Sequence, residues 1–408
     1  MNILLVHNSY QQRGGEDQVF ESEAGLLRAN GHQVTQYHVS NDQISSGSVG
    51  LAARAIWNRE HHRNVCSLIR RNAPHVVHVH NTFPLVSPSV YYAARSCGIP
   101  VVQTLHNYRL LCPGGTLFRS GRICESCVGG SVPWRGVIHR CYRHSVAASA
   151  TVSTMLTVHK LAGTWTSAVD QYIVLNEFAR QQFIRAGFPE ERLCVKPNFV
   201  DPDPGFASAS GHGAIFVGRF TEEKGIHTLL TAWRSIGSSV PLDIVGDGPL
   251  APQVNEAADH MPGIRWLGWL PRADVFNALR GASVAIVPSL WYEPFGMNVA
   301  EAFAVGVPVL ASAIGGLEQM IHQGRTGLLF QPGNDRDLAT KVRWLSEHPD
   351  ELAAMRPHAR REFELNYTAS ANYEMTLHIY NTAIARRTAQ QPQNRSEKVS
   401  QGISGTEA

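Results

Sequence analysis

Long apolar runs are missing from this sequence of 408 residues, and that absence excludes a hydrophobic helix long enough to span a bilayer. The segment that comes nearest, 145–158, carries no charge but is rich in Ser, Thr and Ala. A basic leader and a small-residue cleavage site are also missing, because Met1 leads directly into the strand-like Asn-Ile-Leu-Leu-Val. We therefore expect a cytoplasmic protein without a secretory signal.

Net charge is small as well. The 36 basic and 33 acidic residues leave a net charge of +3, too little for a nucleic-acid partner. The basic residues are unevenly placed: residues 1–200 hold 19 basic and 11 acidic side chains, against 17 and 22 in residues 201–408. The N-terminal half includes Arg54, Arg59, Arg63, Arg70 and Arg71. Such a basic face would draw the protein peripherally to the inner face of a membrane, or to a pyrophosphate-linked acceptor, although a solvated helix surface explains it equally simply.

Seven cysteines, an odd number, argue against a disulfide framework and for free thiols or metal ligands. Cys66, Cys97 and Cys194 fit core or helix positions. The other four share one long insert with the spacing C-x11-C-x2-C-x13-C, at Cys112, Cys124, Cys127 and Cys141. This spacing is compatible with a tetrahedral structural zinc site. The alternatives are four reduced thiols or redox-sensitive pairs.

What the sequence does contain is a regular alternation of short Val/Ile/Leu runs with longer amphipathic stretches, which predicts α/β architecture with parallel strands. In the first half we expect strands at 3–7, 33–39, 75–80, 100–105, 171–175 and 193–196. In the second half we expect strands at 214–217, 242–245, 264–267, 284–287, 307–311 and 327–330. Six strands with right-handed crossovers complete one open sheet, so each half predicts a doubly wound, Rossmann-like domain.

Proline and glycine concentrate between the halves, from Pro197 to Gly213, which is typical of a linker. We expect the following order: an N-terminal domain over 1–197 with the Cys-containing insert at about 108–145, a linker over 198–212, a C-terminal domain over 213–366, a helix over 367–387 and a disordered tail over 388–408. Residues 334–364 look helical. Two open sheets joined by a hinge should face each other across a cleft, with the carboxyl ends of their strands toward the ligand.

The first loop after a predicted strand, 7–16, places Gly14 and Gly15 directly before a helix. Backbone N–H groups and the helix dipole can hold an anion there, although a flexible surface turn is the alternative. The second loop, 218–225, brackets a strand-to-helix turn with Arg219 and Lys224, which suits a diphosphate. The alternative is that the adjacent Glu222 and Glu223 pair with these cations at the surface.

The third loop holds Glu293, Pro294 and Glu301. Pro294 suits the opening turn of a helix, which would separate the two carboxylates by about 10 Å along the axis. One carboxylate could then hold a ribose and the other a hexose, with the N–H groups of Phe295, Gly296 and Met297 facing the phosphates. A structural pair of glutamates is the alternative.

Two glycine-rich turns complete the set. Gly315-Gly316 lies between a strand and a helix, where a base or phosphate could lie against the backbone, and a plain tight turn is equally consistent. The segment 246–251 matches a dinucleotide fingerprint, but Pro249 removes an N–H that a pyrophosphate would need. We therefore do not expect an NAD site.

Taken in order along residues 1–385, these motifs resemble the retaining glycosyltransferases of family four (glycosyl transferases group 1), which have the GT-B fold. The motifs are Arg13-Gly14-Gly15-Glu16, Pro197-Asn198-Phe199-Val200-Asp201, Gly218-Arg219 with Lys224-Gly225, Glu293-x7-Glu301, and Gly315-Gly316. In the linker motif Phe199 replaces the glycine usual in that family.

The resemblance implies roles for single residues. Arg219 and Lys224 would neutralise the donor diphosphate as it leaves, Glu301 would bind the nucleotide ribose, and Glu293 the hydroxyls of the donor sugar. His106 matches a family histidine near the transferred sugar, and Gly15 would let the donor phosphate or the acceptor approach the backbone. The helix 369–387 would cross back onto the N-terminal domain.

The expected activity is transfer of a sugar from a nucleoside-diphosphate sugar to a glycan or lipid-linked acceptor, with retention of configuration, in surface polysaccharide biosynthesis. None of the loops described above contains an Asp-x-Asp motif, so we expect catalysis without a metal. The alternatives are a nucleotide-sugar epimerase, a GT-B phosphorylase or an inactive nucleotide-sugar-binding protein. A phosphorylase would need a lysine for pyridoxal phosphate in the second domain, and none of these motifs presents a lysine in a Schiff-base setting.

Overall fold

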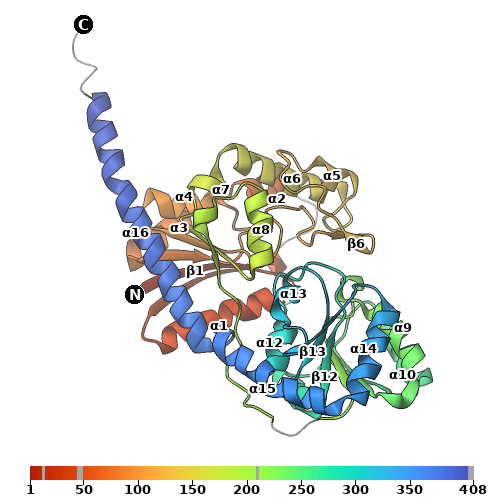
Figure 1. The fold of residues 1–408 in the computed structure, drawn as a ribbon. Coiled ribbons are helices and arrows are strands. Elements are labelled where there is room, and N and C mark those ends of the chain that lie inside the picture. The colour runs from red at the N-terminus through yellow and green to blue at the C-terminus, as the bar shows by residue number, and fades with distance from the viewer. Residues whose placement is uncertain (12–13, 44–48, 208–210, 403–408) are drawn as a thin grey trace.

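The computed structural model describes residues 1–11, 14–43, 49–207 and 211–402. They form two α/β domains joined by a linker and by a long C-terminal helix (Figure 1). None of the described helices is both long and apolar enough to cross a bilayer.

The N-terminal domain is built on a parallel sheet of strand order β2-β1-β3-β4-β7-β8. Its strands are β1 (Asn2–Ser9), β2 (Gln33–Ser40), β3 (Val76–Val79), β4 (Val101–Thr104), β7 (Gln171–Val174) and β8 (Leu193–Val195). Its helices are α1 (Gly15–Ala29), α2 (Val49–Ile56), α3 (Arg59–Asn72), α4 (Ser89–Ser96), α5 (Trp134–Ile138), α6 (Val146–Leu161), α7 (Thr164–Ser167) and α8 (Glu177–Arg185). The insert adds an antiparallel hairpin, β5 (Phe118–Arg119) and β6 (Arg122–Ile123).

Buried strands explain why these short apolar runs are recognisable. Alternate residues of β1 point to opposite faces: Leu4 and Val6 pack with α3 and α4, whereas Ile3 and Leu5 pack with α1 and the C-terminal helix. Because both faces are covered, the central strands are mostly apolar, whereas the edge strand β2 mixes polar and apolar residues.

The C-terminal domain has strand order β11-β10-β9-β12-β13-β14, the doubly wound order in which the switch point lies between β9 and β12. Its strands are β9 (Ala214–Val217), β10 (Leu242–Val245), β11 (Ile264–Gly268), β12 (Val284–Val287), β13 (Val309–Ser312) and β14 (Gly327–Phe330). Its helices are α9 (Ile226–Ile236), α10 (Ala251–His260), α11 (Arg272–Gly281), α12 (Met297–Ala304), α13 (Gly316–Met320), α14 (Asp335–Glu347) and α15 (Pro349–Asn366). Short 3-10 turns occur at Asn41–Gln43, Glu190–Arg192, Glu222–Lys224 and Gly237–Ser239.

The predicted helical segment 334–364 is divided into α14 and α15. Pro349 lacks a backbone N–H and cannot continue α14, but it suits the first turn of α15.

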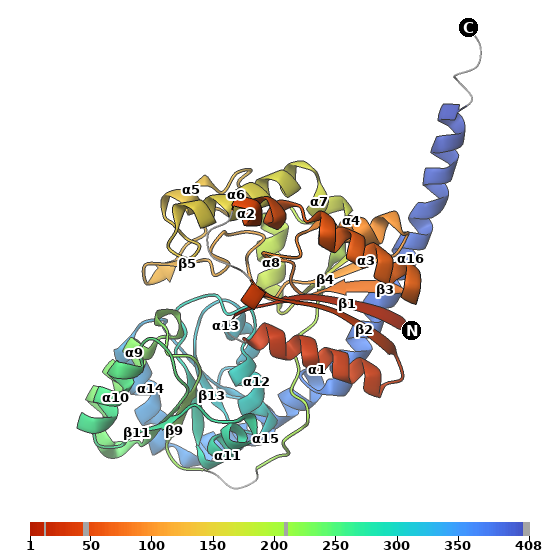
Figure 2. The ribbon, with the colours of Figure 1, turned by 180° about the vertical axis from the view of Figure 1, so that it is seen from behind.

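The chain crosses between the domains twice, and the two crossings lie side by side. Val200 of the linker forms a parallel bridge with Thr368, just before the C-terminal helix α16 (Ala369–Gly402). Asn372 Nδ2 donates to the carbonyl oxygen of Pro197 at 2.7 Å. From there α16 runs over the N-terminal sheet, where Tyr380 is fully buried (Figures 1 and 2).

The end of α16 differs from the prediction. We expected the helix to end at Arg387 and a disordered tail to follow, but α16 continues to Gly402. Residues 388–402 mix helix formers such as Gln, Arg, Glu and Lys with Pro392, Asn394, Ser and Gly402, so the extension rests on propagation from the helix nucleated on the N-terminal domain rather than on composition. The rest of the predicted tail, 403–408, lies outside the described residues.

Candidate functional site

Loops from the carboxyl ends of the two sheets meet between the domains. Asn176, at the start of α8, donates from Nδ2 to the carbonyl oxygen of Pro294 at 2.8 Å. The rings of Phe178 and Tyr292 lie 4.4 Å apart. A Cβ on Gly316 would come within 2.3 Å of Asn176 Nδ2, so a side chain there would push the domains apart. Close approach between domains therefore explains Gly316 in addition to the tight turn considered from sequence.

The centre of the C-terminal half of the site is an ion pair. Lys224 Nζ lies 2.6 Å from Glu293 Oε1, and the hydroxyl of Ser289 donates to the same oxygen at 2.7 Å. The Glu293 side chain is buried, whereas that of Lys224 is 17% exposed, so the ammonium group can be reached from solvent. The structure brings together two of the residues that the sequence assigns to the donor.

A left-handed glycine fixes Lys224 in place. Gly225 has φ 74°, and a Cβ there would lie 1.8 Å from the carbonyl oxygen of Pro288. Only glycine allows this approach between the loops after β9 and β12. Leu290 N donates to the carbonyl oxygen of Glu223 at 2.8 Å and joins the same two loops.

Arg219 lies on the same loop as Lys224 but is exposed, and its guanidinium has no hydrogen bond or ion pair with the part of the chain that the structure describes. Among those residues it does not pair with Glu222 or Glu223, the partners considered from sequence. The guanidinium is therefore available to an anionic ligand. Gly246 and Gly248 pack their backbones against Gly218 and Phe220, so packing between loops accounts for the glycines of the dinucleotide-like segment.

Helix α12 begins at Met297, three residues later than Pro294, because Phe295 turns inward and packs on Tyr367. Glu293 therefore precedes the helix, and Phe295 and Gly296 lead into it. The N-terminus of α12 presents N–H groups that lack partners within the helix. Glu301 lies in the second turn of α12, and its Oε1 is 3.9 Å from Arg272 Nε. Burial raises the pKa of Glu301 to about 7, and Arg272 partly offsets this.

His106 stands on the N-terminal side, directly after β4. Its Nε2 is 2.9 Å from His80 Nδ1, and its side chain is largely buried. Burial lowers the pKa of His106 to about 3, with help from the neighbouring histidines. At neutral pH the imidazole is therefore uncharged and can donate or accept one hydrogen bond toward a ligand. A cavity of about 40 Å³ is lined by His80, His106, Asn107 and Arg109 among others.

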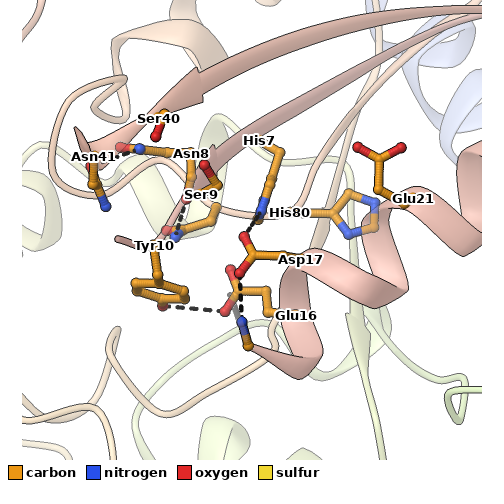
Figure 3. Close-up of polar contacts among 12 residues, drawn as sticks. His7, Asn8, Ser9, Tyr10, Glu16, Asp17, Glu21, Ser40, Asn41 and His80 are labelled. Carbon is orange, nitrogen blue, oxygen red and sulfur yellow. Dashed lines mark hydrogen bonds and ion pairs between the residues drawn. The ribbon is translucent and has the colours of Figure 1, made fainter. Parts of the chain in front are cut away.

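Glu16 is a functional candidate to which the sequence analysis assigned no role. Tyr10 Oη donates to Glu16 Oε2 at 3.2 Å (Figure 3). Asn107 Nδ2 donates to the same oxygen at 3.3 Å. The other oxygen, Oε1, is buried and has no partner among the described residues. Burial, followed by the charge of Asp17, raises the pKa of Glu16 to about 8. A carboxyl group directly after two glycines on a strand-end loop was the available signal.

The Gly14-Gly15 turn is fixed by Asp17, which accepts hydrogen bonds from the N–H of Gly14 and from His7 Nε2, both at 2.8 Å (Figure 3). Gly15 is exposed, and no atom lies within 4 Å of the position a Cβ would take. This open space is what the predicted close approach of a ligand needs. Arg13 of the same motif lies outside the described residues.

A buried polar network runs from His106 to the hinge. His78 lies against His80, and its ring nitrogens are 2.8 Å from Tyr380 Oη and from Thr104 Oγ1. Lys196 Nζ is 3.1 Å from Glu23 Oε2, and Glu23 Oε1 is 3.1 Å from His78 Nδ1. In the described part of the chain Glu23, His78 and His80 are the group close enough to share a metal. The Lys196 ammonium already neutralises Glu23, so this network fits a structural ion pair better than a metal site.

The four insert cysteines are free and partly buried. A Cβ on Gly114 would lie 3.7 Å from Cys112 Sγ and 3.7 Å from Cys141 Cβ, so these two thiols approach each other. Burial, followed by the nearby Cys112, raises the pKa of Cys127 to about 11. In the described part of the chain, no three of the four sulfur atoms lie close enough together to share a metal ion. Cys124 Sγ donates to Ser126 Oγ at 3.6 Å.

Two facing doubly wound domains with a cationic strand-end loop define a protein of the GT-B fold class. Two family models cover most of the chain: Glycosyltransferase Family 4 matches residues 13–204, and Glycosyl transferases group 1 matches residues 211–362. The chain belongs to the glycosyl transferases group 1 family.

Known proteins give the same assignment. Glycogen synthase of Mycobacterium tuberculosis is 30% identical over 187 residues, which cover 44% of this chain and 44% of that protein. The chain thus aligns with less than half of that relative's length. A glycosyltransferase structure from Rickettsia africae superposes with a TM-score of 0.69 at 16% identity, over 94% of this chain and 98% of that one. Anabaena Alr3699/HepE in complex with UDP gives 0.63 at 18% identity, over 93% and 100%. These structures support the fold alone.

Proposed function

We propose that this protein is a retaining glycosyltransferase that moves a sugar from a nucleoside-diphosphate sugar to a glycan or lipid-linked acceptor in surface polysaccharide biosynthesis. The observation that carries the proposal is the loop 218–225, where Lys224 is held against Glu293 while Arg219 is left without a partner among the described residues. Two cations at the end of a parallel strand, beside a helix N-terminus, suit a diphosphate.

The donor would lie along the α12 segment. Arg219 and Lys224 contact the diphosphate, and the N-terminus of α12 faces it. Glu301 accepts hydrogen bonds from the ribose hydroxyls, while Glu293 orients the transferred sugar. The Anabaena protein is solved with UDP and with UDP-glucose, which supports a nucleotide-sugar donor here.

The chemistry follows from charge. Cleavage of the bond between the anomeric carbon and the diphosphate oxygen leaves negative charge on phosphate and positive charge on the sugar ring. Cations fixed beforehand at the phosphate lower the barrier, because they need no reorganisation during the reaction. The acceptor hydroxyl attacks on the face that the phosphate leaves, gives its proton to the departing phosphate, and so retains the configuration. His106, neutral near pH 7, contributes a hydrogen bond to the sugar rather than a charge.

The test is a transfer assay with the Arg219→Ala/Lys224→Ala double variant. We expect at least a 1,000-fold loss of turnover, because loss of a single donor of this kind costs about 100- to 1,000-fold. NMR of the product's anomeric proton should show the configuration of the donor. Near-normal turnover in the double variant, or an inverted product, would refute the proposal.

We also propose that the four insert cysteines hold a structural zinc ion and that catalysis itself needs no metal. The insert has only two two-residue strands and one five-residue helix, and segments with so little core are commonly stabilised by metal. Rotation about the Cα–Cβ bonds would have to bring the four sulfurs together. Elemental analysis should find one zinc per wild-type chain and none in Cys112→Ser/Cys141→Ser, with Cys66→Ser as the control. Wild-type protein that contains no metal would refute the zinc site. If a chelator abolishes sugar transfer by Cys112→Ser/Cys141→Ser, metal-independent catalysis is contradicted.

For a lipid-linked acceptor the protein would work at the inner face of a membrane, as a peripheral protein. On α3 the side chains of Arg59, Arg63 and Arg70 are exposed, and they supply a basic surface on the N-terminal domain.

A further inference from the structure

The insert and the helix after it carry a surface that the proposed reaction does not use. From Ser126 to Val169 the sequence contains four basic residues and no acidic one. Three of these basic residues are exposed around α5. We define the insert patch as these three together with four exposed apolar side chains: Val132, Trp134, Arg135, Ile138, Arg140, Arg143 and Val146.

The apolar members of the insert patch are unusually exposed. Trp134 is 54% exposed and Ile138 is 64% exposed, while Val132 and Val146 are each 49% exposed. Isolated exposed apolar side chains are normal on a protein surface, but a group of this kind marks an interaction site. These four fall within fifteen consecutive residues, on α5 and the segments directly before and after it.

The packing of α5 holds its side chains outward. Gly136 is buried, and a Cβ there would lie 2.7 Å from Pro113 Cγ, so this face of α5 rests directly on Pro113. Ser153 of α6 donates to the carbonyl oxygen of Pro133 at 3.2 Å and fixes the start of α5. Trp134 and Ile138 are four residues apart and lie on one face of α5, away from the buried Gly136, so both remain exposed.

An aromatic and a basic side chain are neighbours at this surface. The guanidinium of Arg135 lies 5.4 Å from the centre of the Trp134 ring. Tryptophan beside arginine suits the boundary between lipid headgroups and acyl chains, where the ring can be buried while the cation meets phosphate. Without any acidic residue from 126 to 169, the patch is complementary to a negatively charged surface.

We infer that the insert patch docks this protein on an anionic lipid bilayer, with Trp134 and Ile138 entering the headgroup boundary and Arg135 and Arg140 contacting lipid phosphates. The inference deepens the proposed function and rests on it only in that a lipid-linked acceptor must be met at a membrane. Figure 2 places α2, α5 and α6 on the side of the N-terminal domain that lies away from α1 and the C-terminal domain.

The insert also reaches the donor loop. A Cβ on Gly121, at the tip of the β5–β6 hairpin, would lie 3.1 Å from Glu222 Oε1. Behind α5 a cavity of about 380 Å³ is lined by Pro133, Leu156, Trp165 and Phe188, with Lys160 beside them. One insert therefore connects the bilayer surface, an apolar cavity and the loop that carries Arg219.

The test is co-sedimentation of the full chain with vesicles of phosphatidylcholine alone or with 30% phosphatidylglycerol (about 0.1 M salt, where charges are screened beyond about 10 Å). We expect binding only to the anionic vesicles. Trp134→Ser/Ile138→Ser and Arg135→Glu/Arg140→Glu should each weaken it at least tenfold. Trp269→Ser, which removes a 73% exposed tryptophan from the C-terminal domain, should bind like wild type.

Arg63→Glu/Arg70→Glu on α3 is the charge-matched control and separates the insert patch from the basic helix. Wild-type affinity in this control supports the insert patch, whereas a loss confined to it would overturn our assignment. Wild-type protein that ignores anionic vesicles would also overturn it, as would a patch-dependent dimer in sedimentation velocity without vesicle binding. Unchanged thermal unfolding of every variant shows that the fold is intact, and donor hydrolysis in solution reports the proposed function separately.

Discussion

The two halves of the site are built in different ways. In the C-terminal half, Lys224 and Glu293 form an ion pair, and Ser289 donates a hydrogen bond to Glu293. The two loops that carry them pack closely at Gly225. In the N-terminal half, the pKa of Glu16 is raised and that of His106 is lowered. Glu16 Oε1 and His80 Nε2 are buried atoms without a hydrogen-bond partner among the described residues. A rigid charged half suits a constant ligand such as a diphosphate, whereas a half with free hydrogen-bonding groups suits the hydroxyls of the sugar and the acceptor.

The largest expected effect breaks the rigid half. Gly225→Ala puts a methyl group against the carbonyl oxygen of Pro288 and forces alanine into the left-handed region. We expect a loss of at least about 2 kcal/mol in unfolding free energy, because strain of this kind costs about 1–3 kcal/mol before any clash is counted. Urea denaturation measures the change.

Gly163→Ala is the matched control for that variant. Gly163 is left-handed like Gly225, with φ 64° and ψ 22°, but the nearest atom to its Cβ position is Thr166 Oγ1 at 3.5 Å, an ordinary contact. This variant should lose only about 1–2 kcal/mol. Equal losses at both positions would show that the contact with Pro288 does not hold the donor loops together.

The N-terminal half predicts an effect that depends on pH. Glu16 has a pKa of about 8 in the folded protein, above its ordinary value of 4.5. Its contribution to the unfolding free energy is therefore fully present below pH 4.5 and is lost as the pH rises toward 8. Glu16→Gln mimics the protonated carboxyl. We expect it to raise the melting temperature relative to wild type by about 2 °C or more at pH 8, with little difference at pH 4.5.

Glu318→Gln is the control, since the Glu318 side chain is exposed. It should leave the melting temperature unchanged at both pH values. Glu301→Gln in the other half should behave like Glu16→Gln over a narrower range, from pH 4.5 to about 7. If Glu16→Gln changes the melting temperature equally at pH 4.5 and pH 8, the raised pKa of Glu16 is contradicted.

The smallest expected effect concerns the connection between the histidines and α16. Tyr380→Phe removes the hydroxyl that lies 2.8 Å from His78 Nδ1 and should cost about 1 kcal/mol in urea denaturation, with a larger value if His78 is left unpaired. Tyr373→Phe, whose hydroxyl meets the half-buried His32, should cost less. If the order is reversed, α16 is not anchored through His78.

The sequence was sufficient for the strands and for the loops that follow them, because both rest on local patterns. Buried parallel strands are continuous apolar runs, and every strand of the two large sheets overlaps a predicted one. Lys224 and Glu293 could be placed at neighbouring loops because parallel strands end at one edge of a sheet. The pair's direct contact, and the role of Ser289, needed the structure.

Groups that depend on distant partners could not be predicted. Glu16 becomes buried because Asn107, 91 positions away, closes over it, and Gly316 is constrained by Asn176 of the other domain. His80 lies beside His106 only because β3 and β4 are neighbours. The predicted end of the helix at Arg387 differs from the structure, where α16 continues to Gly402, because propagation from a helix packed on the N-terminal domain is not visible in local composition.

The central claim is that Arg219 and Lys224 hold a nucleoside diphosphate, and calorimetric titration tests it most directly. Wild-type protein would be titrated with UDP, GDP and ADP, and Arg219→Ala/Lys224→Ala with whichever binds. We predict that at least one binds wild type and that the double variant binds it at least 100-fold more weakly, which corresponds to about 2.7 kcal/mol. Equal affinity for wild type and variant, or no binding of any of the three, would contradict the account.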